Sequence, residues 1–476
     1  MQHLVALLTS FALFTAAAAV ASPPSKIYGV NLGSWLVLEA WMLPQEWLDM
    51  GGTSSSCCAG CISDEWSFAQ AYPNTVDEIF DTHWSTWFTE DHVQQLQADG
   101  INAVRIPLGY WIVEPLVNRS SEYYPRGGIK QLQRGVQQLQ DAGIVVILDH
   151  HALPGVQTAN QQFTGHCTSD VEFYTPYNYH RALVWTAVMT ALSHLDPAFG
   201  NVFAIEAVNE PIMDANQTPG YGEFQINFVQ TVRAVELILG IPVPDVTLPF
   251  SLGTSNTTAA FMKVAAANST SLPAIFNPNV TAALAEAGPI LLQVAAELAS
   301  PSVLDFTSTQ APVFSSKTPL WTNFMDVNWQ YDNPPNPANA AIGPQGYDNH
   351  LYYNYGGVAD PNPDAYMYSI CNLQRVQADA ALGDTPLWFG EWGLPTQFDA
   401  TDEFLYMWAD AQKMAYTEGA GWIFWNFNVE KSTLAGNLSR QWSYLDGVNY
   451  GFLTKDPAAY HNASVCDPYY YNTTSA

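Results

Sequence analysis

Two glutamates, Glu210 and Glu391, lie at the ends of apolar runs that are typical of buried strands. The run at residues 202–208 ends two residues before Glu210, and the run at residues 386–391 ends on Glu391 itself. Paired carboxyl groups at strand ends suit glycoside hydrolysis, because one protonated carboxyl can deliver a proton to the leaving oxygen while an ionised one attacks the anomeric carbon. A single such glutamate could equally form a loop salt bridge or cap a helix. Two such pairings are less favoured, since the chain has only 15 Lys and Arg residues.

Further polar and aromatic residues lie at the ends of other apolar runs. An arginine near a carboxylate holds it ionised through its charge and paired hydrogen bonds, and a tryptophan offers a flat apolar platform for a sugar ring. Each could instead be structural, for example an ion pair at the barrel floor for Arg105 or core packing for Trp425. Their joint placement favours one shared site. These candidates are Arg105, His150, His151, His350, Tyr352 and Trp425.

Eight apolar runs bounded by turn residues recur along the chain, as expected for strands that are buried on both faces. Helical stretches such as residues 89–99, 129–142 and 177–193 lie between several of them. This alternation predicts an α/β fold, a (β/α)8 TIM barrel, whose active site would lie at the C-terminal ends of the strands. The predicted strands are residues 27–32, 101–107, 144–150, 202–208, 319–326, 347–352, 386–391 and 422–427.

Two connections are far longer than a βα unit of about 30 residues requires. The first contains a cluster of cysteines, and the fourth runs from residue 210 to about residue 317. We therefore expect long loop insertions after the first and fourth strands, the second of them at about residues 244–316 with a helix over residues 280–298. No internal repeat or interdomain linker is evident, so residues 22–476 are predicted to form one catalytic domain.

The composition excludes some classes of function. With 44 Asp and Glu against 15 Lys and Arg, the net charge is −29, and no basic surface is available for nucleic acid. Residues 1–21 resemble a secretory signal peptide with an A-x-A cleavage site, and no later apolar run is long enough to predict a membrane span. Eight N-x-S/T sequons also favour a secreted glycoprotein, either extracellular or associated with the cell wall. They lie at Asn118, Asn216, Asn256, Asn268, Asn279, Asn437, Asn462 and Asn472.

The six cysteines fit an oxidising compartment and suggest three disulfides, for which fifteen pairings are possible. Cys57, Cys58 and Cys61 crowd one loop. A zinc or redox role for the pair Cys58 and Cys61 is conceivable, but a loop stapled by disulfides is the simpler interpretation.

An ordered set of short motifs resembles glycoside hydrolase family 5, and within it the secreted fungal exo-β-1,3-glucanases. The motifs extend over most of the chain, so the resemblance covers nearly the whole of it. They are GVNLGSWLVLE at residues 29–39, VRIP at 104–107, VNEP at 208–211, DNHLY at 348–352, FGEW at 389–392 and GWIFW at 421–425.

The resemblance implies a role for each matching residue. Glu210 matches the acid/base of the family and Glu391 its nucleophile. The remaining matches are to substrate-binding and supporting residues: Asn209 to the partner of the sugar 2-OH, Arg105 and Tyr352 to the partners of the nucleophile, His350 to the histidine near the acid/base, Trp425 to the aromatic floor of the glycone subsite, and Glu39 to the acidic residue that grips the terminal glucose.

The string Asp149-His-His-Ala-Leu-Pro154 departs from the family pattern D-L-H-G-A-P. The family histidine lies three residues before proline, which selects His151 over His150. Because successive strand residues face opposite ways, we expect one of the two histidines to point away from the site. This variant and the two insertions leave the linkage preference open. By resemblance, Cys371 pairs with Cys466, and the other four cysteines form two bridges among themselves.

The resemblance implies a retaining β-glucan hydrolase that releases glucose from the non-reducing end of β-1,3-glucan. The alternatives are an endo-β-1,6-glucanase or other β-glucanase on the same scaffold and, from another class, a glucan-binding protein without catalysis. A metal-dependent hydrolase built on Asp149, His150, His151 and His350 is disfavoured, since adjacent strand histidines do not share one ion. We therefore expect no metal, no cofactor, no nucleic acid or membrane partner, a β-glucan polysaccharide or oligosaccharide as substrate, and a monomer.

Overall fold

The computed structural model describes residues 22–53, 56–248, 257–267, 272–300, 303, 317–331 and 333–471. The predicted signal peptide at residues 1–21 lies outside the described residues. The same holds for parts of the predicted insertion at residues 244–316 and for the sequons at Asn256, Asn268 and Asn472. The other five sequon asparagines are all exposed.

Eight parallel strands form a closed barrel in which each strand pairs with its neighbours in the sequence and the last pairs with the first. The predicted TIM barrel and all eight predicted strands are therefore confirmed. The strands are β1 (Ile27–Asn31), β2 (Ala103–Gly109), β3 (Val145–Ala152), β4 (Val202–Glu206), β5 (Trp321–Met325), β6 (Gln345–His350), β7 (Leu387–Glu391) and β8 (Gly421–Phe424).

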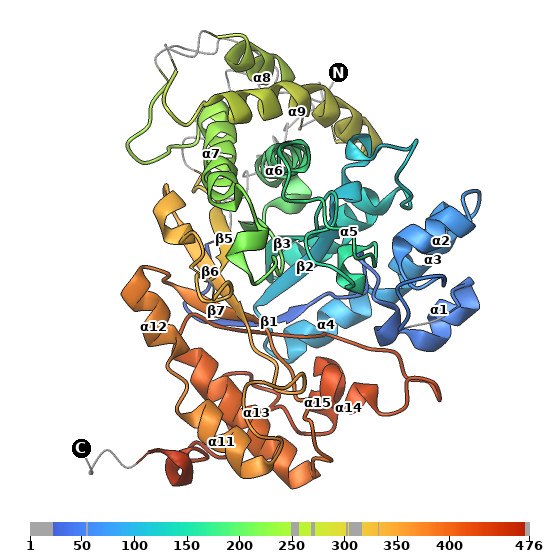
Figure 1. Cartoon of the computed structure of the whole chain (residues 1–476), viewed down its shortest axis with the longest axis vertical. Helices are drawn as coiled ribbons and strands as arrows, with labels where there is room; N and C mark the ends of the chain where they lie inside the picture. The colour runs from blue at the N-terminus through green and yellow to red at the C-terminus, as the bar shows by residue number, and fades with distance from the viewer. Residues whose placement is uncertain are drawn as a thin grey trace, which may run out of the picture.

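Helices surround the barrel, as Figure 1 shows. Those of the first half are α1 (Pro44–Met50), α2 (Glu65–Ala71), α3 (Val76–Trp87), α4 (Glu90–Ala98), α5 (Gly128–Asp141), α6 (Pro176–Leu195) and α7 (Tyr221–Leu239). The later ones are α8 (Thr257–Ala265), α9 (Pro278–Glu297), α11 (Pro363–Cys371), α12 (Arg375–Leu382), α13 (Asp402–Thr417), α14 (Leu438–Trp442) and α15 (Tyr444–Asn449).

Helices α5 and α6 differ in how they are buried. In α5, Ile129, Leu132, Val136 and Leu139 are buried at a spacing of three or four residues, which is the one-sided pattern of a helix at the surface of a barrel. In α6, by contrast, nearly every residue after Ala182 is buried. The reason is that α9 lies on the outer side of α6.

The connection from β4 to β5 contains α7, α8 and α9. Among the described residues, α9 is the one helix long and apolar enough to span a membrane by length and composition. Its contacts with α6, α7 and α8 account for this apolar character, because they bury half of it within the fold (Figure 1).

Three disulfides join Cys57 to Cys61, Cys58 to Cys167, and Cys371 to Cys466. The expected pairing of Cys371 with Cys466 is confirmed, as are the two bridges among the other four cysteines. The bridge from Cys58 to Cys167 ties the loop after β1 to the loop after β3, and Cys371 at the end of α11 holds the C-terminal segment.

Five strands end earlier than predicted, three of them by two or three residues. β4 stops at Glu206 rather than at residue 208, β6 stops at His350 rather than at residue 352, and β8 stops at Phe424 rather than at residue 427. Glu210 has a positive φ of 39°, which lies outside the extended conformation of a strand. The predicted site residues Asn209, Glu210 and Trp425 therefore lie in the first turn beyond their strands.

Candidate active site

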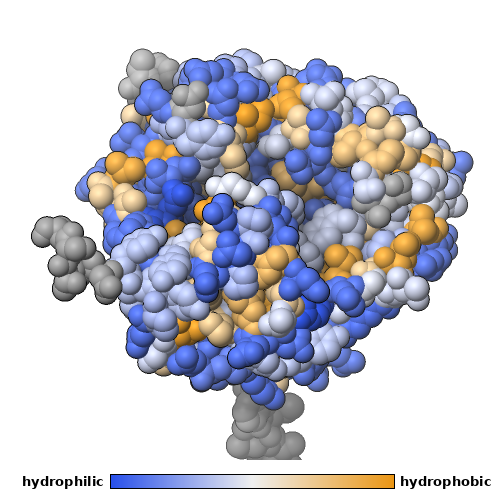
Figure 2. All heavy atoms as spheres, turned by 60° about the horizontal axis from the view of Figure 1, so that its bottom comes forward, coloured by the Kyte–Doolittle hydropathy of each residue, from blue (hydrophilic) through white to orange (hydrophobic). Residues whose placement is uncertain are grey.

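A cavity of about 910 Å³ lies at the C-terminal ends of the strands. Its walls come from the loops after β1, β3, β4, β5 and β6 and from the ends of β6, β7 and β8. Figure 2 shows a face of the molecule that is hollowed near its centre, with hydrophilic and hydrophobic residues mixed around the hollow. Of the predicted site residues, Arg105 lies beneath the cavity, and the following line it: Glu39, His151, Asn209, Glu210, His350, Tyr352, Glu391 and Trp425.

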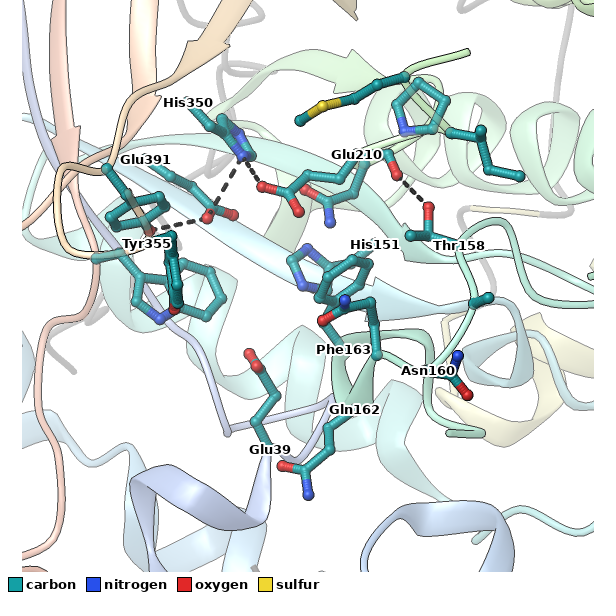
Figure 3. A pocket seen from close by; sticks show the side chains of 18 of the residues that line it. Glu39, His151, Thr158, Asn160, Gln162, Phe163, Glu210, His350, Tyr355 and Glu391 are labelled. Carbon is teal, nitrogen blue, oxygen red and sulfur yellow. Dashed lines mark hydrogen bonds and ion pairs between the residues drawn. The ribbon is translucent and has the colours of Figure 1, made fainter. Parts of the chain in front are cut away.

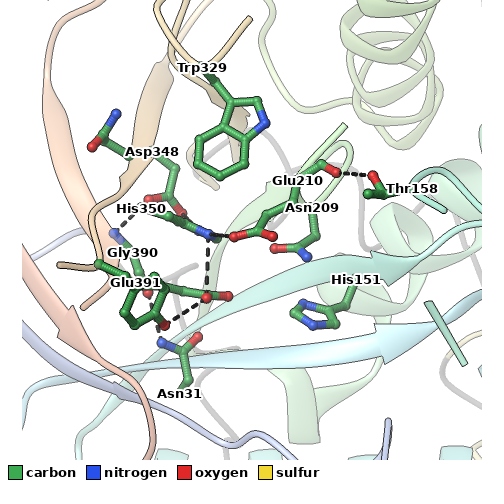
Figure 4. Close-up of polar contacts among 12 residues, drawn as sticks. Asn31, His151, Thr158, Asn209, Glu210, Trp329, Asp348, His350, Gly390 and Glu391 are labelled. Atoms are coloured by element: carbon green, nitrogen blue, oxygen red, sulfur yellow. Dashed lines mark hydrogen bonds and ion pairs between the residues drawn. The ribbon is translucent and has the colours of Figure 1, made fainter. Parts of the chain in front are cut away.

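Glu391 ends β7 and is held by three donors. Its Oε1 accepts from Nη1 of Arg105 at 3.1 Å, and its Oε2 accepts from the hydroxyl of Tyr352 at 2.9 Å. Nδ1 of His350 lies 3.4 Å from the same Oε2. The preceding Gly390 allows this packing, because a Cβ there would lie 2.0 Å from Oδ2 of Asp348. The other carboxyl oxygen of Asp348, Oδ1, accepts the Gly390 N–H at 2.6 Å (Figure 4).

Glu210 follows β4 and is held by fewer contacts. Its Oε1 lies 2.7 Å from Nδ1 of His350, and its backbone carbonyl accepts from the hydroxyl of Thr158 at 2.5 Å (Figure 4). The positive φ of 39° is a costly conformation for a residue with a side chain, and such strain is concentrated at functional sites. An oxygen of Glu210, an oxygen of Glu391 and a nitrogen of His350 all lie within 4.8 Å of one another.

The imidazole of His350 lies between the two glutamates and is protonated. Burial alone lowers the pKa of this imidazole, but the charge of Glu391 and hydrogen bonds to Asp348 and Glu210 raise its pKa well above the usual range. At neutral pH, His350 is therefore a buried imidazolium that faces both carboxyl groups of the cavity.

Arg105 connects the site to the interior of the barrel. Burial opposes its charge, but the carboxylates around it raise the pKa of Arg105 well above its ordinary value, so it is a permanent cation. Besides Glu391, it contacts Asp149 at 3.1 Å and Glu206 at 2.8 Å, and its Nη2 donates to Asn209 at 2.8 Å. One guanidinium thus orients residues from β3, the β4 end and β7 together.

Burial raises the pKa of several carboxyl groups near this guanidinium. Asp149 rises to about 7 and Glu206 to about 8, although Arg105 opposes both shifts. Burial likewise raises the pKa of Glu391 to about 8, with a further rise from Glu210, against the lowering effects of His350, Arg105 and Tyr352. The site therefore holds more carboxyl groups than its two cations neutralise.

The adjacent histidines of β3 point in opposite directions, as predicted. His151 lines the cavity, bonds Asp149 through Nδ1 at 2.6 Å and stacks on Trp425 with ring centroids 5.7 Å apart. His150 instead stacks on Trp185 of α6 at 4.0 Å. The two histidines therefore share no centre, which argues against the metal hypothesis built on them.

Glu39 lies across the cavity from the glutamate pair, with its carboxyl group directed into the cavity (Figure 3). The indole N–H of Trp41 donates to its Oε2 at 2.9 Å. Burial raises the pKa of Glu39 to about 8, and the charges of Glu391 and Glu210 add to this rise. At neutral pH, a protonated Glu39 can both donate and accept hydrogen bonds.

Nδ2 of Asn209 and Nε2 of His151 are buried in the cavity wall and have no hydrogen-bond partner among the described residues. Buried polar groups are rarely left unpaired, so each nitrogen marks a place where a hydroxyl of a bound ligand could form the missing hydrogen bond.

Several residues around the site were missed by the sequence analysis. Glu206 is one of them, although a charged residue inside the apolar run 202–208 could have indicated it. The aromatic walls lie beyond the strands, in loops, a 3-10 turn and the short helix α14, and carried no periodic pattern. These cavity residues are Trp41, Trp329, Tyr355 and Trp442.

Two sets of three residues bring possible metal ligands together within the described part of the chain: Glu206, Asp348 and His350, and Glu210, His350 and Glu391. In both sets His350 is the nitrogen donor, and its raised pKa disfavours the neutral form that a metal requires. Arg105 also lies 3.1 Å from Glu391, where it already compensates the charge of that carboxylate. The donor set therefore fits proton transfer better than metal binding.

A barrel whose mouth holds a closely spaced carboxyl pair, a shared imidazole and aromatic walls is the arrangement of a glycoside hydrolase. Residues 71–431 match the model of the cellulase family, glycosyl hydrolase family 5, and the chain therefore belongs to this family. The chain is an enzyme of the glycoside hydrolase class.

Relatives similar to this chain fall into two groups. Glucan endo-1,6-beta-glucosidase B of Emericella nidulans is 28% identical over 452 residues, which cover 93% of this chain and 88% of the relative. Glucan 1,3-beta-glucosidase of Blumeria graminis is 32% identical over 194 residues, which cover 39% of this chain and 41% of the relative. Among solved structures, rutinosidase from Aspergillus niger has a similar fold, with a TM-score of 0.55 and 17% identity over 90% of this chain and 97% of that one.

Proposed function

We propose that the chain is a retaining β-glucanase that cleaves β-1,6-linked glucan internally. The observation that carries the linkage is the extent of similarity: the endo-1,6 relative matches over 93% of this chain, whereas the 1,3 relative matches over 39%. The extent matters because the loops that shape the cavity rim are included in the longer match. The alternative from the sequence analysis is thus better supported than the expected exo action on β-1,3-glucan.

Glu210 and Glu391 have the proposed roles of acid/base and nucleophile. Their oxygens lie within 4.8 Å of one another, in keeping with the separation of about 5–5.5 Å between carboxyl groups in retaining glycosidases. An inverting enzyme needs room for a water molecule and a separation of about 6.5–9.5 Å.

In the first step, a carboxylate oxygen of Glu391 attacks the anomeric carbon, and the bond from that carbon to the glycosidic oxygen breaks. Glu210 gives its proton to the leaving oxygen. Nδ1 of His350, 2.7 Å from Glu210, orients the carboxyl group of this acid. Arg105 and Tyr352 bind and orient the attacking carboxylate.

In the second step, Glu210 takes a proton from water, and the water oxygen attacks the anomeric carbon from the side that the leaving group vacated. The ester bond to Glu391 breaks, and the sugar regains its β configuration. Asn209 offers its free Nδ2 to a sugar hydroxyl, and Trp425 supports the apolar face of the ring.

A second candidate is exo action on β-1,3-glucan, which Glu39 favours. Its carboxyl group, beside the indole of Trp41, can donate hydrogen bonds to and accept them from the hydroxyls of a terminal glucose. An internal sugar would have to displace these bonds to pass.

We also propose that the protein is secreted and glycosylated, and acts as a monomer on extracellular or cell-wall glucan. Three disulfides support an oxidising compartment. The exposed sequons at Asn118, Asn216, Asn279, Asn437 and Asn462 are available for modification.

Early digests of pustulan, a β-1,6-glucan, and laminarin, a β-1,3-glucan, test the proposal. We expect faster cleavage of pustulan and a ladder of oligosaccharides at low conversion. Faster cleavage of laminarin with glucose as the only early product would overturn the proposed function in favour of the second candidate.

A further inference from the structure

A second cavity, of about 560 Å³, adjoins the first. Its wall includes Cys58, Trp66, Gln70, His166 and Cys167. Cys58 lines both cavities, so the two meet at the disulfide that joins it to Cys167.

One loop serves both cavities. The loop after β3 contributes Thr158, Asn160 and Phe163 to the cavity with the glutamates and then His166 to the second cavity. A linear ligand that follows this loop outward from the glutamates would therefore pass Cys58 and reach Trp66.

The second cavity contains a preformed pair of rings. The indole of Trp66 stacks on the imidazole of His166, with centroids 4.1 Å apart and planes only 4° from parallel. Tyr123 and Tyr124 contact Trp66 edge-on, each at 5.4 Å. Trp66 and His166 are both half-buried, and the part of each ring that stays accessible lines the cavity.

The backbone around these rings is fixed by contacts that do not need a ligand. Asp64 caps α2 by accepting from the N–H of Ser67 at 2.7 Å, and its other oxygen accepts from the N–H of Cys167 at 2.7 Å. Trp66 donates its own N–H to the carbonyl of Gly165 at 3.0 Å. Binding here would cost little conformational entropy, because the site is preorganised.

The lining chemistry selects a neutral, hydroxyl-rich ligand. The described lining residues include no Lys or Arg, which disfavours an anion, and both carboxyl oxygens of Asp64 are engaged with backbone N–H groups. Burial lowers the pKa of His166, so at neutral pH its imidazole is uncharged and can both donate and accept. The exposed amide of Gln70 makes no hydrogen bond within the described chain.

We infer that this second cavity is a remote subsite, which binds a sugar unit of the same glucan chain several units from the cleaved bond. Trp66, Gln70 and His166 are the residues that contact this sugar. The inference rests on the proposed glucanase function. It implies that the enzyme binds long substrates more tightly than short ones. An enzyme that binds only a terminal glucose would show no such gain in affinity.

The test compares a polymer with a substrate too short to reach the second cavity. For each variant, kcat/KM is measured on pustulan and on an aryl β-glucoside, and the ratio of the two is compared with that of the wild type. We expect Trp66→Ala to lower the ratio about tenfold and Gln70→Ala about threefold, the sizes of one aromatic contact and one hydrogen bond. Gln94→Ala, an exposed glutamine on α4 outside both cavities, is the matched control and should leave the ratio within about twofold.

Binding without turnover gives an independent readout. In the Glu391→Gln background, migration through a gel containing pustulan should be retarded, and Trp66→Ala should remove most of that retardation. If Trp66→Ala fails to fold because Tyr123 and Tyr124 lose their partner, Gln70→Ala alone decides. Unchanged ratios and unchanged migration for folded variants would overturn the subsite. If the wild type prefers laminarin, the proposed linkage fails, and the same ratio measured on laminarin still decides the subsite.

Discussion

Glu391 and Glu210 reach the same nitrogen of His350 from opposite sides of the barrel mouth, yet they are held very differently. Glu391 has a side chain only 7% exposed and contacts Arg105, Tyr352 and His350. Glu210 has a side chain 20% exposed, a single side-chain partner and a strained backbone. An attacking carboxylate must keep one position, whereas an acid/base must reach the leaving oxygen and then a water molecule, so the difference in restraint matches the difference in proposed role.

Replacing Glu391 should have the largest effect. Glu391→Ala removes the attacking oxygen, and we expect kcat to fall by about four to six orders of magnitude. Added azide should then restore turnover of an aryl β-glucoside and yield the α-glucosyl azide, because azide attacks from the side that Glu391 occupied. A β-glucosyl azide from this variant would contradict the assignment.

Replacing Glu210 should have a smaller effect that depends on the substrate. Glu210→Ala should lower kcat/KM on pustulan by about two to four orders of magnitude, since the sugar leaving group needs a proton. An activated aryl glucoside should keep most of the rate of its first step, and azide should yield the β-glucosyl azide. Equal losses on both substrates would remove the distinction between the two glutamates.

The hydrogen bond from the Tyr352 hydroxyl to Glu391 can be tested through the pH dependence of kcat/KM. This hydroxyl stabilises the ionised carboxylate, so Tyr352→Phe should raise the pKa of Glu391 further above its ordinary value of 4.5. Activity requires ionised Glu391 and is lost as pH falls through that pKa, so the acidic limb of kcat/KM should move to higher pH, by less than about one unit.

The control is Tyr355→Phe, since Tyr355 lines the same cavity without a hydrogen bond to Glu391. Its acidic limb should stay in place. A shift of the Tyr352→Phe limb toward lower pH would mean that the hydroxyl does not stabilise the carboxylate.

Replacing the two adjacent histidines of β3 should have the smallest effects on kcat/KM. The two variants form a matched pair, because only His151 faces the cavity. His151→Phe removes Nε2 from the cavity wall and the bond to Asp149, and kcat/KM should fall by about tenfold to a hundredfold. His150→Phe keeps a ring on Trp185 and removes two unpaired buried nitrogens, so kcat/KM should stay within about twofold. A larger loss for His150→Phe would place the site elsewhere.

The strands and the order of the site residues could be predicted from the sequence because barrel strands are buried on both faces and leave continuous apolar runs. The opposite directions of His150 and His151 follow from the period of a strand alone. The aromatic walls could not be predicted, since Trp41, Trp329 and Trp442 lie in short segments beyond the strands whose path is set by tertiary contacts. Nor could the raised pKa values of the carboxyl groups around Arg105 be predicted, since they arise only when these groups from separate strands are buried as neighbours.

We propose that the linkage preference depends on the loops around the cavity. Motifs at the strand ends define the family and its chemistry, and they are common to enzymes of different specificity. The insertion after β1 contributes Glu39, Trp41 and Cys58 to the cavity wall, and it carries no motif from which a linkage could be deduced. For this reason, similarity over the full length favours a linkage that the short motifs did not.

The central claim is that Glu391 and Glu210 act as a double-displacement pair. Proton NMR of a fresh pustulan digest tests it directly, because the anomeric signal of the new reducing end reports the stereochemistry before mutarotation. The account predicts that the β-anomer appears first and the α-anomer grows in later. Initial release of the α-anomer would contradict a covalent intermediate on Glu391 and would require an attacking water that a separation within 4.8 Å leaves no room for.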